Sequence, residues 1–380
     1  MTPETILTNA LLVLPDAVMP GTLVFRDGLL AEVQPGRSHA PGAEDCHGDH
    51  LIPGLVDLHT DNLERQVLPR ANARWPSLSA LLAHDAQCAA AGVTTVLDAL
   101  CLGDLGFDPG RGQTYRDGVR DLDTMGAAGA LKCEHLLHLR CELPAPDLLA
   151  ALDGMAAHPR VVMASLMDHS PGVGQYRDLE RYKDMRMRQK GLSVQDVEAR
   201  IGELLEQRAR LREPQRRVVL DMFAPRGMPL ASHDDDNADE VARNARDGIM
   251  ISEFPVAMEA AAATRALGVT VIGGAPNIVR GGSHSGNLAV ADLVRDGLLD
   301  AFASDYVPSS MIEACWRTAS MPGLTLPRAV AMVAEAPAAM ARLADRGRLA
   351  AGLRADVVRV RTIAGLPVLR GVWCRGERVA

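Results

Sequence analysis

Short apolar runs alternate with longer amphipathic stretches through the middle of the chain. Apolar runs bounded by Gly, Pro, Asn or Asp predict buried strands, and apolar residues spaced three or four apart predict helices. Eight strands are predicted in this way, at residues 55–58, 94–99, 135–140, 161–167, 229–232, 248–252, 269–272 and 300–304. Helices are predicted between most of them, including 77–91, 239–246 and 256–267. This alternation is typical of a parallel α/β barrel.

Both ends of the chain carry a different pattern, of short strands separated by turns. Residues 5–14 and 22–25 are rich in β-forming residues, and Arg26-Asp27-Gly28 is a turn signal before the next apolar run. Strands are predicted again at 355–360 and 369–374. We therefore expect a distorted TIM (β/α)8 barrel over residues 53–346 and a small β-sandwich domain formed from both termini, residues 1–52 and 347–380.

One stretch interrupts the alternation between the fourth and fifth predicted strands. Residues 176–217 are strongly charged and include an amphipathic helical pattern over 194–211. A solvated helical excursion and a basic lid over the barrel mouth would both produce this pattern. The loops that follow the strands form the active-site face of such barrels, so the position is compatible with either role.

Composition and charge narrow the class of partner. The 380 residues carry a formal charge of −8, which argues against nucleic-acid binding but allows a locally positive site for an anionic small molecule. No apolar run is long enough to span a bilayer and no signal-peptide pattern is present, so we expect no membrane association. Seven cysteines without a CxxC pair indicate reduced thiols in a cytoplasmic protein. An aliphatic barrel exterior would also allow a homodimer.

The most informative stretch is an apolar strand over 52–61 that ends in His59-Thr60-Asp61. Residues two apart on a strand point to the same side, so His59 and Asp61 can both face the barrel interior. Imidazole nitrogen and carboxylate oxygen are suitable ligands for a divalent transition metal. An isolated HxD carries little weight, and this one gains weight from the residues that end the other strands.

Four further ionisable residues close or follow predicted strands, namely Glu142, His169, His233 and Asp305. A barrel brings the carboxyl ends of its strands to one mouth, so we expect these side chains to converge with His59 and Asp61. Three histidines and three carboxylates could hold two divalent ions, for which zinc is the first expectation and Mn, Fe or Co are alternatives.

The residue types suggest separate roles within this set. Asp305 is the predicted general base, because a carboxylate beside a metal-activated water can accept its proton. Glu142 is the predicted bridge between the ions, and Lys132 is a rival for that role. Asp168 and Asp234 adjoin ligand candidates and are expected to orient imidazoles.

A glycine-rich stretch over residues 273–287 follows the seventh predicted strand. Glycines let backbone N–H groups approach an anion, and arginine, serine and histidine add further donors. The alternative is a flexible loop without a ligand. The predicted phosphate contacts are Arg280, Gly281, Gly282, Ser283 and His284, with Arg70, Arg140 and Tyr176 as additional candidates at the same mouth.

Several stretches resemble the amidohydrolase superfamily and, more narrowly, the PhnM family. They lie, in order, at residues 58–64, 92–99, 137–143, 165–172, 231–235, 252–255, 276–287 and 304–306. That family comprises α-D-ribose 1-methylphosphonate 5-triphosphate diphosphatases of the carbon–phosphorus lyase pathway. The resemblance implies release of diphosphate from the 5-triphosphate in phosphonate catabolism. It also implies metal roles for the six residues His59, Asp61, Glu142, His169, His233 and Asp305. The chain departs from the family pattern at Pro69-Arg70-Ala71 and over residues 172–176, which concerns substrate contacts.

Two other functions are compatible with the residues. One is hydrolysis of a C–N bond, by a deacetylase or a cyclic amidase on the same scaffold, since metal-activated water attacks either centre. A neutral amide substrate has no need of the basic segment 280–287. The other is a metal-free barrel without enzymatic activity, which the presence of all six ligand candidates disfavours.

Overall fold

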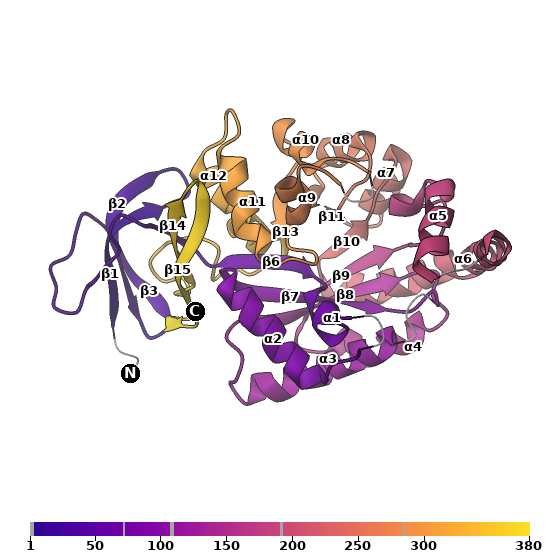
Figure 1. Ribbon diagram of the computed structural model, residues 1–380, viewed down its shortest axis with the longest axis horizontal. Coiled ribbons are helices and arrows are strands. Elements are labelled where there is room, and N and C mark those ends of the chain that lie inside the picture. Colours follow the sequence, from indigo (N-terminus) through magenta and orange to yellow (C-terminus); the bar gives the residue numbers. More distant parts are fainter. Residues whose placement is uncertain (1–3, 71–72, 107–109, 191–192, 284–285) are drawn as a thin grey trace.

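The computed structural model describes residues 4–70, 73–106, 110–190, 193–283 and 286–380. Eight parallel strands follow one another in chain order around a barrel, as predicted (Figure 1). They are β6 (Leu55–Thr60), β7 (Val93–Leu102), β8 (Glu134–Glu142), β9 (Val161–Met167), β10 (Leu230–His233), β11 (Ile251–Glu253), β12 (Thr270–Gly274) and β13 (Ala301–Ala303). The prediction of a distorted TIM barrel is confirmed.

The barrel closes at the carboxyl ends of its first and last strands. Thr60 and Asp305 form a parallel bridge, and the backbone N–H of Asp61 donates to the carbonyl of Asp305 at 2.9 Å. Towards the other end, the N–H of Val56 instead donates to the carbonyl of Val333. Helix α13 (Glu335–Met340) contacts both strands there and contributes to the core beneath them. The barrel is therefore distorted between β6 and β13, which are hydrogen-bonded to each other mainly at the mouth. We call this junction the seam.

Helices cover the outside of the barrel. The N-terminal group is α1 (Asn62–Val67), α2 (Ser77–Ala90), α3 (Arg111–Ala127) and α4 (Leu148–Leu152), with the 3-10 helix η1 (Met155–Ala157). The C-terminal group is α7 (Ala238–Arg246), α8 (Met258–Ala266), α9 (Ala275–Arg280), α10 (Val290–Arg295), α11 (Ser310–Ala319) and α12 (Leu326–Ala331). In the described ranges, no helix is both long and apolar enough to cross a membrane.

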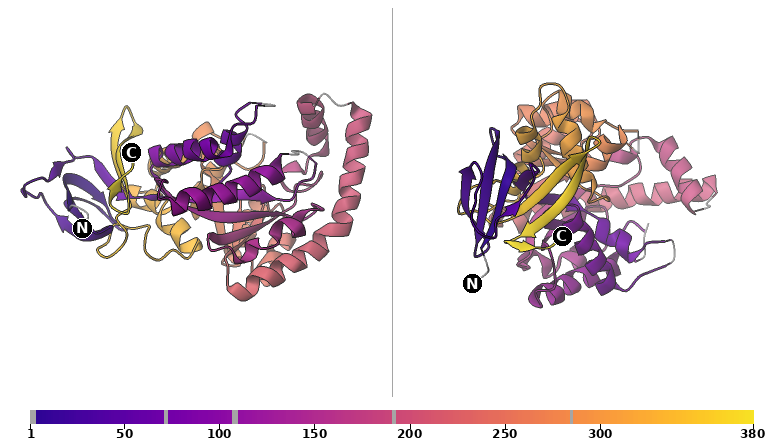
Figure 2. Two further views of the ribbon diagram at one scale, coloured as in Figure 1. Left: turned by 90° about the horizontal axis from the view of Figure 1, so that it is seen from below. Right: turned by 60° about the vertical axis from the view of Figure 1, so that its left-hand side comes forward.

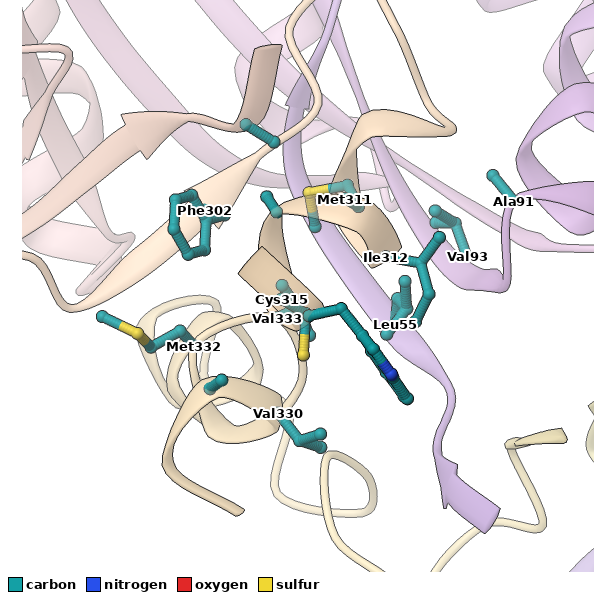
Figure 3. Close-up of a cluster of buried hydrophobic side chains, with 14 of the residues drawn as sticks. Leu55, Ala91, Val93, Phe302, Met311, Ile312, Cys315, Val330, Met332 and Val333 are labelled. Atoms are coloured by element: carbon teal, nitrogen blue, oxygen red, sulfur yellow. The ribbon is translucent and has the colours of Figure 1, made fainter. Parts of the chain in front are cut away.

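The core between barrel and helices is aliphatic, as the 3% content of aromatic residues requires. Figure 3 shows Leu55 and Val93 from neighbouring strands beside Ile312 of α11, with Phe302 and Val333 in the same cluster. All five side chains are almost completely buried. Burial of this apolar surface fixes the barrel wall to α11 and α12.

The charged insertion forms a helical arm that projects from the barrel (Figure 2). It comprises η2 (Gly174–Tyr176), α5 (Leu179–Lys190), α6 (Val194–Phe223) and η3 (Ala224–Arg226). Helix α6 starts at a capping box between Ser193 and Asp196 and continues through Pro214, beyond the end predicted at residue 211. Its last turns stay helical because Val219 and Phe223 are fully buried against the barrel.

Strands from both termini form the second, mixed sheet. They are β1 (Thr5–Val13), β2 (Val18–Arg26), β3 (Leu29–Pro35), β4 (Glu44–Asp45), β5 (His50–Pro53), β14 (Val357–Ile363), β15 (Leu366–Cys374) and β16 (Glu377–Arg378). Although β2 and β15 are separated by three strands in this sheet, Phe25 meets Trp373 edge-on with ring centroids 6.0 Å apart. The sheet therefore folds over one core, which accounts for the predicted domain built from both ends.

We expect Trp373→Ala to lower the free energy of unfolding by about 3–5 kcal/mol, because it empties the centre of this core. Trp373 is 3% exposed, whereas Trp75 is 55% exposed and provides a matched control. Trp75→Ala should change stability by no more than about 0.5 kcal/mol. Urea denaturation followed by circular dichroism measures both. Equal losses in the two variants would contradict the packing described for the terminal sheet.

Candidate metal centre

Ionisable side chains end or follow six barrel strands and meet at one mouth. His59 belongs to β6, while Glu142, His233 and Glu253 are the last residues of β8, β10 and β11. His169 and Asp305 each lie two residues beyond a strand, after β9 and β13. The convergence follows from the parallel topology, which directs every carboxyl end to the same face.

Three residues beside these strand ends adopt left-handed backbone conformations. The φ angles are 57° at Asp234, 53° at Phe254 and 55° at Asp305. Such conformations cost a non-glycine residue roughly 1–3 kcal/mol and concentrate at functional sites, where the surrounding structure enforces them. Asp234 and Asp305 both line the pocket at the mouth.

The fully buried carboxylate of Glu253 lies between two histidines. One oxygen is 3.1 Å from Nδ1 of His59, and the other is 3.4 Å from Nδ1 of His233. A carboxylate accepts a hydrogen bond from each Nδ1–H, which leaves both Nε2 atoms without a proton and able to bind a metal. The sequence analysis missed Glu253, although it directly follows the predicted strand 248–252.

Glu142 holds a third histidine in the same manner. Its two oxygens accept from the backbone N–H of His169 at 2.8 Å and from Nδ1 of His169 at 2.5 Å. On the opposite side of the rings, Nε2 of His169 and Nε2 of His233 lie 3.9 and 3.8 Å from one oxygen of Asp234. The three atoms surround a common point that suits a divalent cation. Glu142 thus lies behind His169, and Asp234 faces both Nε2 atoms.

His138 is a further buried histidine at the centre and was not identified from the sequence. Nδ1 of His138 donates to the carbonyl of Leu58 at 3.0 Å and lies 3.8 Å from Glu253. Within the described residues, its Nε2 is buried without a hydrogen-bond partner. His138, Arg140 and Glu142 alternate along β8, so a strand period of two would have placed all three on one face.

The charges of the centre call for a cation. Burial and the neighbouring Asp305 raise the pKa of Asp61 to about 8, and burial raises the pKa of Asp234 to about 7. Burial also lowers the pKa of His233 to about 3 and that of His59 well below its usual range. An oxygen of Asp61 is buried without a hydrogen-bond partner in the described part of the chain. Neutral imidazoles beside carboxylates that repel each other fit a bound divalent ion.

Two residues expected near the metal are placed elsewhere. The ammonium of Lys132 donates to the carbonyl of Val379 at 2.9 Å, at the opposite end of β8, so the alternative prediction of a lysine bridge is wrong. The expectation that Asp168 orients an imidazole is also wrong. One of its oxygens accepts from Arg208 at 2.7 Å and Arg212 at 2.9 Å, which ties α6 to the loop that carries His169.

A pocket of about 290 Å³ opens above the centre. Its lining includes His59, Asp61, His233, Asp234 and Asp305 from the centre, and Arg140, Arg280, Ser283 and Asn287 around it. Two arginines and several polar groups next to the carboxylates make a site for an anionic ligand.

The predicted phosphate contacts are distributed unequally. Arg140, Arg280 and Ser283 line the pocket, whereas Gly281 and Gly282 do not reach its described lining. Residues 275–280 form α9, and Gly281 caps this helix at a φ of 83°, so the first half of the glycine-rich stretch is helical. His284 lies outside the described residues.

Two other candidates stand back from the described pocket lining. Arg70 is exposed and bridges to Ala73. Tyr176 packs edge-on against His169 with ring centroids 6.1 Å apart. It therefore contacts a metal-ligand candidate from the side of the arm.

The helical arm reaches the mouth of the barrel. Gln175 lines the pocket, and the guanidinium of Arg186 lies over the rings of Tyr176 and Tyr182. A Cβ atom added to Gly286 would lie 2.2 Å from Nη1 of Arg181. The guanidinium of Arg181, from α5, thus lies against the glycine-rich segment at Gly286.

Comparison with known proteins agrees with this site. No family model matches the chain. The chain is 39% identical over 376 residues to the alpha-D-ribose 1-methylphosphonate 5-triphosphate diphosphatase of Escherichia coli (strain K12), covering 98% of this chain and 100% of that protein. Because this full-length relative is named as an enzyme, the alternative of a scaffold without activity is set aside.

Solved structures share the fold at low sequence identity. N-acetyl-D-glucosamine-6-phosphate deacetylase from Mycobacterium smegmatis has a TM-score of 0.65 at 16% identity, over 99% of this chain and 100% of that one. Beta-aspartyl dipeptidase from Fervidobacterium islandicum has a TM-score of 0.66 at 16% identity, over 99% of this chain and 97% of that one. These similarities establish the amidohydrolase fold alone. By its full-length relative, the chain is a hydrolase that belongs to the alpha-D-ribose 1-methylphosphonate 5-triphosphate diphosphatase family.

Proposed function

We propose that this protein is a metal-dependent diphosphatase that converts alpha-D-ribose 1-methylphosphonate 5-triphosphate to the 5-phosphate and diphosphate. The observation that carries the proposal is the 39% identity, over the whole chain, to a relative named for this activity. The pocket supports it, because Arg140 and Arg280 stand beside a histidine–carboxylate centre. An amide substrate without charge would leave these arginines unpaired, which disfavours hydrolysis of a C–N bond.

The donor set suits one or two divalent ions. His169, His233 and Asp234 would hold one ion, and the neighbouring His59, Asp61 and Asp305 offer ligands for another. A bound ion lowers the pKa of water and polarises a phosphoryl oxygen. The buried carboxylates of Glu142 and Glu253 keep the ligand imidazoles in one tautomer and one orientation.

Asp305 is suited to accept the proton of the attacking water. It follows β13, lines the pocket, and is fixed by backbone hydrogen bonds to β6. Burial raises the pKa of Asp305 to about 6, so the carboxylate is mostly ionised at neutral pH but more basic than an exposed aspartate. A base with a pKa near the working pH is the most effective in proton transfer.

Asp305→Asn should reduce turnover by about 10²–10⁴-fold, because the amide cannot accept the proton. Diphosphate released from a ribose 5-triphosphate substrate measures the effect. Asp296→Asn removes the same charge from an exposed residue and should leave turnover unchanged. Turnover in Asp305→Asn equal to wild type would refute the assignment of the base, and no diphosphate release by metal-loaded wild type would refute the proposed activity.

Arg280→Ala should raise KM for the triphosphate by roughly 10–100-fold, as expected for a charged hydrogen bond worth about 1.5–3 kcal/mol. Arg280 ends α9 at the pocket wall, whereas Arg295 ends α10 on the exposed surface and serves as control. Steady-state kinetics of diphosphate release would separate KM from kcat. An equal change in KM for Arg280→Ala and Arg295→Ala would argue against phosphate binding by Arg280.

Metal-free protein should lose stability as the pH rises from 6.5 to about 8.5. The pKa values of Asp61 and Asp234 are raised in the folded state, to about 8 and about 7. In this pH range the folded protein therefore holds protons that the unfolded chain has already lost, and the free energy of unfolding falls as the pH rises. The lowered pKa values of His59 and His233 act only below their ordinary value of 6.5.

Thermal melting at several pH values, with and without added zinc, tests this expectation. Zinc should flatten the decline because it stabilises the ionised carboxylates. Asp61→Asn should reduce the decline in metal-free protein, while Asp296→Asn should not. Identical pH profiles for wild type and Asp61→Asn would show that the Asp61 carboxyl is not held in its neutral form.

A further inference from the structure

A chain of buried polar side chains lies outside the centre, between α2 and the barrel wall. It comprises Asn62 of α1, His84 and Asp85 of α2, Asp98 of β7 and His135 of β8. Each of these residues is at most 2% exposed. None of them belongs to the described lining of the pocket above the metal centre.

Hydrogen bonds connect the five residues end to end. Asp85 accepts from Nε2 of His135 at 3.2 Å, and Nδ1 of His135 donates to Asp98 at 2.8 Å. The second oxygen of Asp98 accepts from Nε2 of His84 at 2.7 Å. The amide of Asn62 then donates to Nδ1 of His84 at 2.9 Å.

The partners determine where the protons are. Nδ1 of His84 faces the amide of Asn62, and Nε2 of His84 faces Asp98. Both nitrogens of His135 face carboxylates, so it is an imidazolium. Burial alone would lower its pKa, but Asp98 and Asp85 raise the pKa of His135 to about 9. With every ring nitrogen hydrogen-bonded, this cluster is complete without an ion.

The chain ends beside the metal centre. Asn62 is the first residue of α1 and directly follows Asp61. Its backbone N–H donates to Oγ1 of Thr60 at 3.3 Å, and that hydroxyl donates to the carbonyl of Asp305 at 3.0 Å. A shift of the Asn62 side chain would therefore move the backbone that carries both Asp61 and the contact with Asp305.

We propose that the chain Asp85–His135–Asp98–His84–Asn62 positions Asp61 for metal binding. The inference rests on the proposed metal centre. The residues are positioning groups, since they act through the start of α1 and touch neither metal ligand side chains nor the pocket. Their effect should resemble that of other groups that orient ligands, whose loss weakens metal affinity by about 10–100-fold.

Metal affinity tests the proposal independently of substrate. Apo-protein is titrated with Zn²⁺ in competition with a chromophoric chelator, and melting temperature is recorded for each variant. Asn62→Ala should weaken zinc binding 10–100-fold, and His84→Ala should do the same. Because both act in one chain, the double variant should bind no more weakly than the weaker single one.

Thr22→Val is the matched control. Thr22 is buried and makes two hydrogen bonds, to Thr8 and to the carbonyl of Gly36, but it lies in the terminal sheet. The Thr22→Val substitution should lower the melting temperature without changing zinc affinity. Zinc affinity within twofold of wild type in folded Asn62→Ala and His84→Ala overturns the proposal, as does an equal loss in Thr22→Val. If wild type releases no diphosphate while Asn62→Ala still weakens zinc binding, the proposed function fails and this inference stands.

Discussion

The geometry of the barrel mouth depends on the buried carboxylate of Glu253. Its two oxygens face imidazoles from β6 and β10, strands that three others separate in the sheet order. An unpaired carboxylate in this position would be expensive to bury, and two unoriented imidazoles could not present the same nitrogens to one point. Glu142 repeats the arrangement with His169. Carboxylates behind histidines thus define which atoms of the mouth are available for a ligand.

Around this rigid centre the protein places its positive charge on separate elements. Arg140 comes from the barrel wall, Arg280 from the end of α9, and Arg181 and Arg186 from the helical arm. The arm is anchored to the barrel by Arg208 and Arg212, in the middle of α6, which bind Asp168 next to His169. Arg140 and Arg280, from elements distant in sequence, therefore bring positive charge to one pocket, although the net charge of the chain is −8.

The sequence was sufficient for the fold because the period of apolar residues is a local property. Strand ends also predicted that His59, Glu142, His169, His233 and Asp305 meet at the mouth, since parallel topology converts position along a strand into position at the mouth. Glu142 was predicted as a bridge between ions, but its two oxygens accept hydrogen bonds from His169. Which side of an imidazole meets a carboxylate is decided by contacts between strands, and no local pattern contains it. For the same reason the relation of Asp234 to His169 and His233 emerged only from the structure.

Predictions that differ from the structure also have physical causes. Pro214 lies inside α6, where the burial of Val219 and Phe223 outweighs the lost backbone hydrogen bond. Arg70 follows the first site motif closely in sequence, but it lies beyond the end of α1 on the exposed surface. Lys132 precedes its strand rather than ending it, so it emerges at the opposite face of the barrel.

The seam between β6 and β13 gives the centre a second significance. The residues that join the two strands at the mouth, Thr60, Asp61 and Asp305, include two carboxylates of the site itself. Separation of the first and last strands would pull these ligand candidates apart. An ion held by both carboxylates would connect the first and last strands of the barrel. Metal binding and closure of the barrel would then be one cooperative equilibrium, and the last step of folding would also complete the metal site.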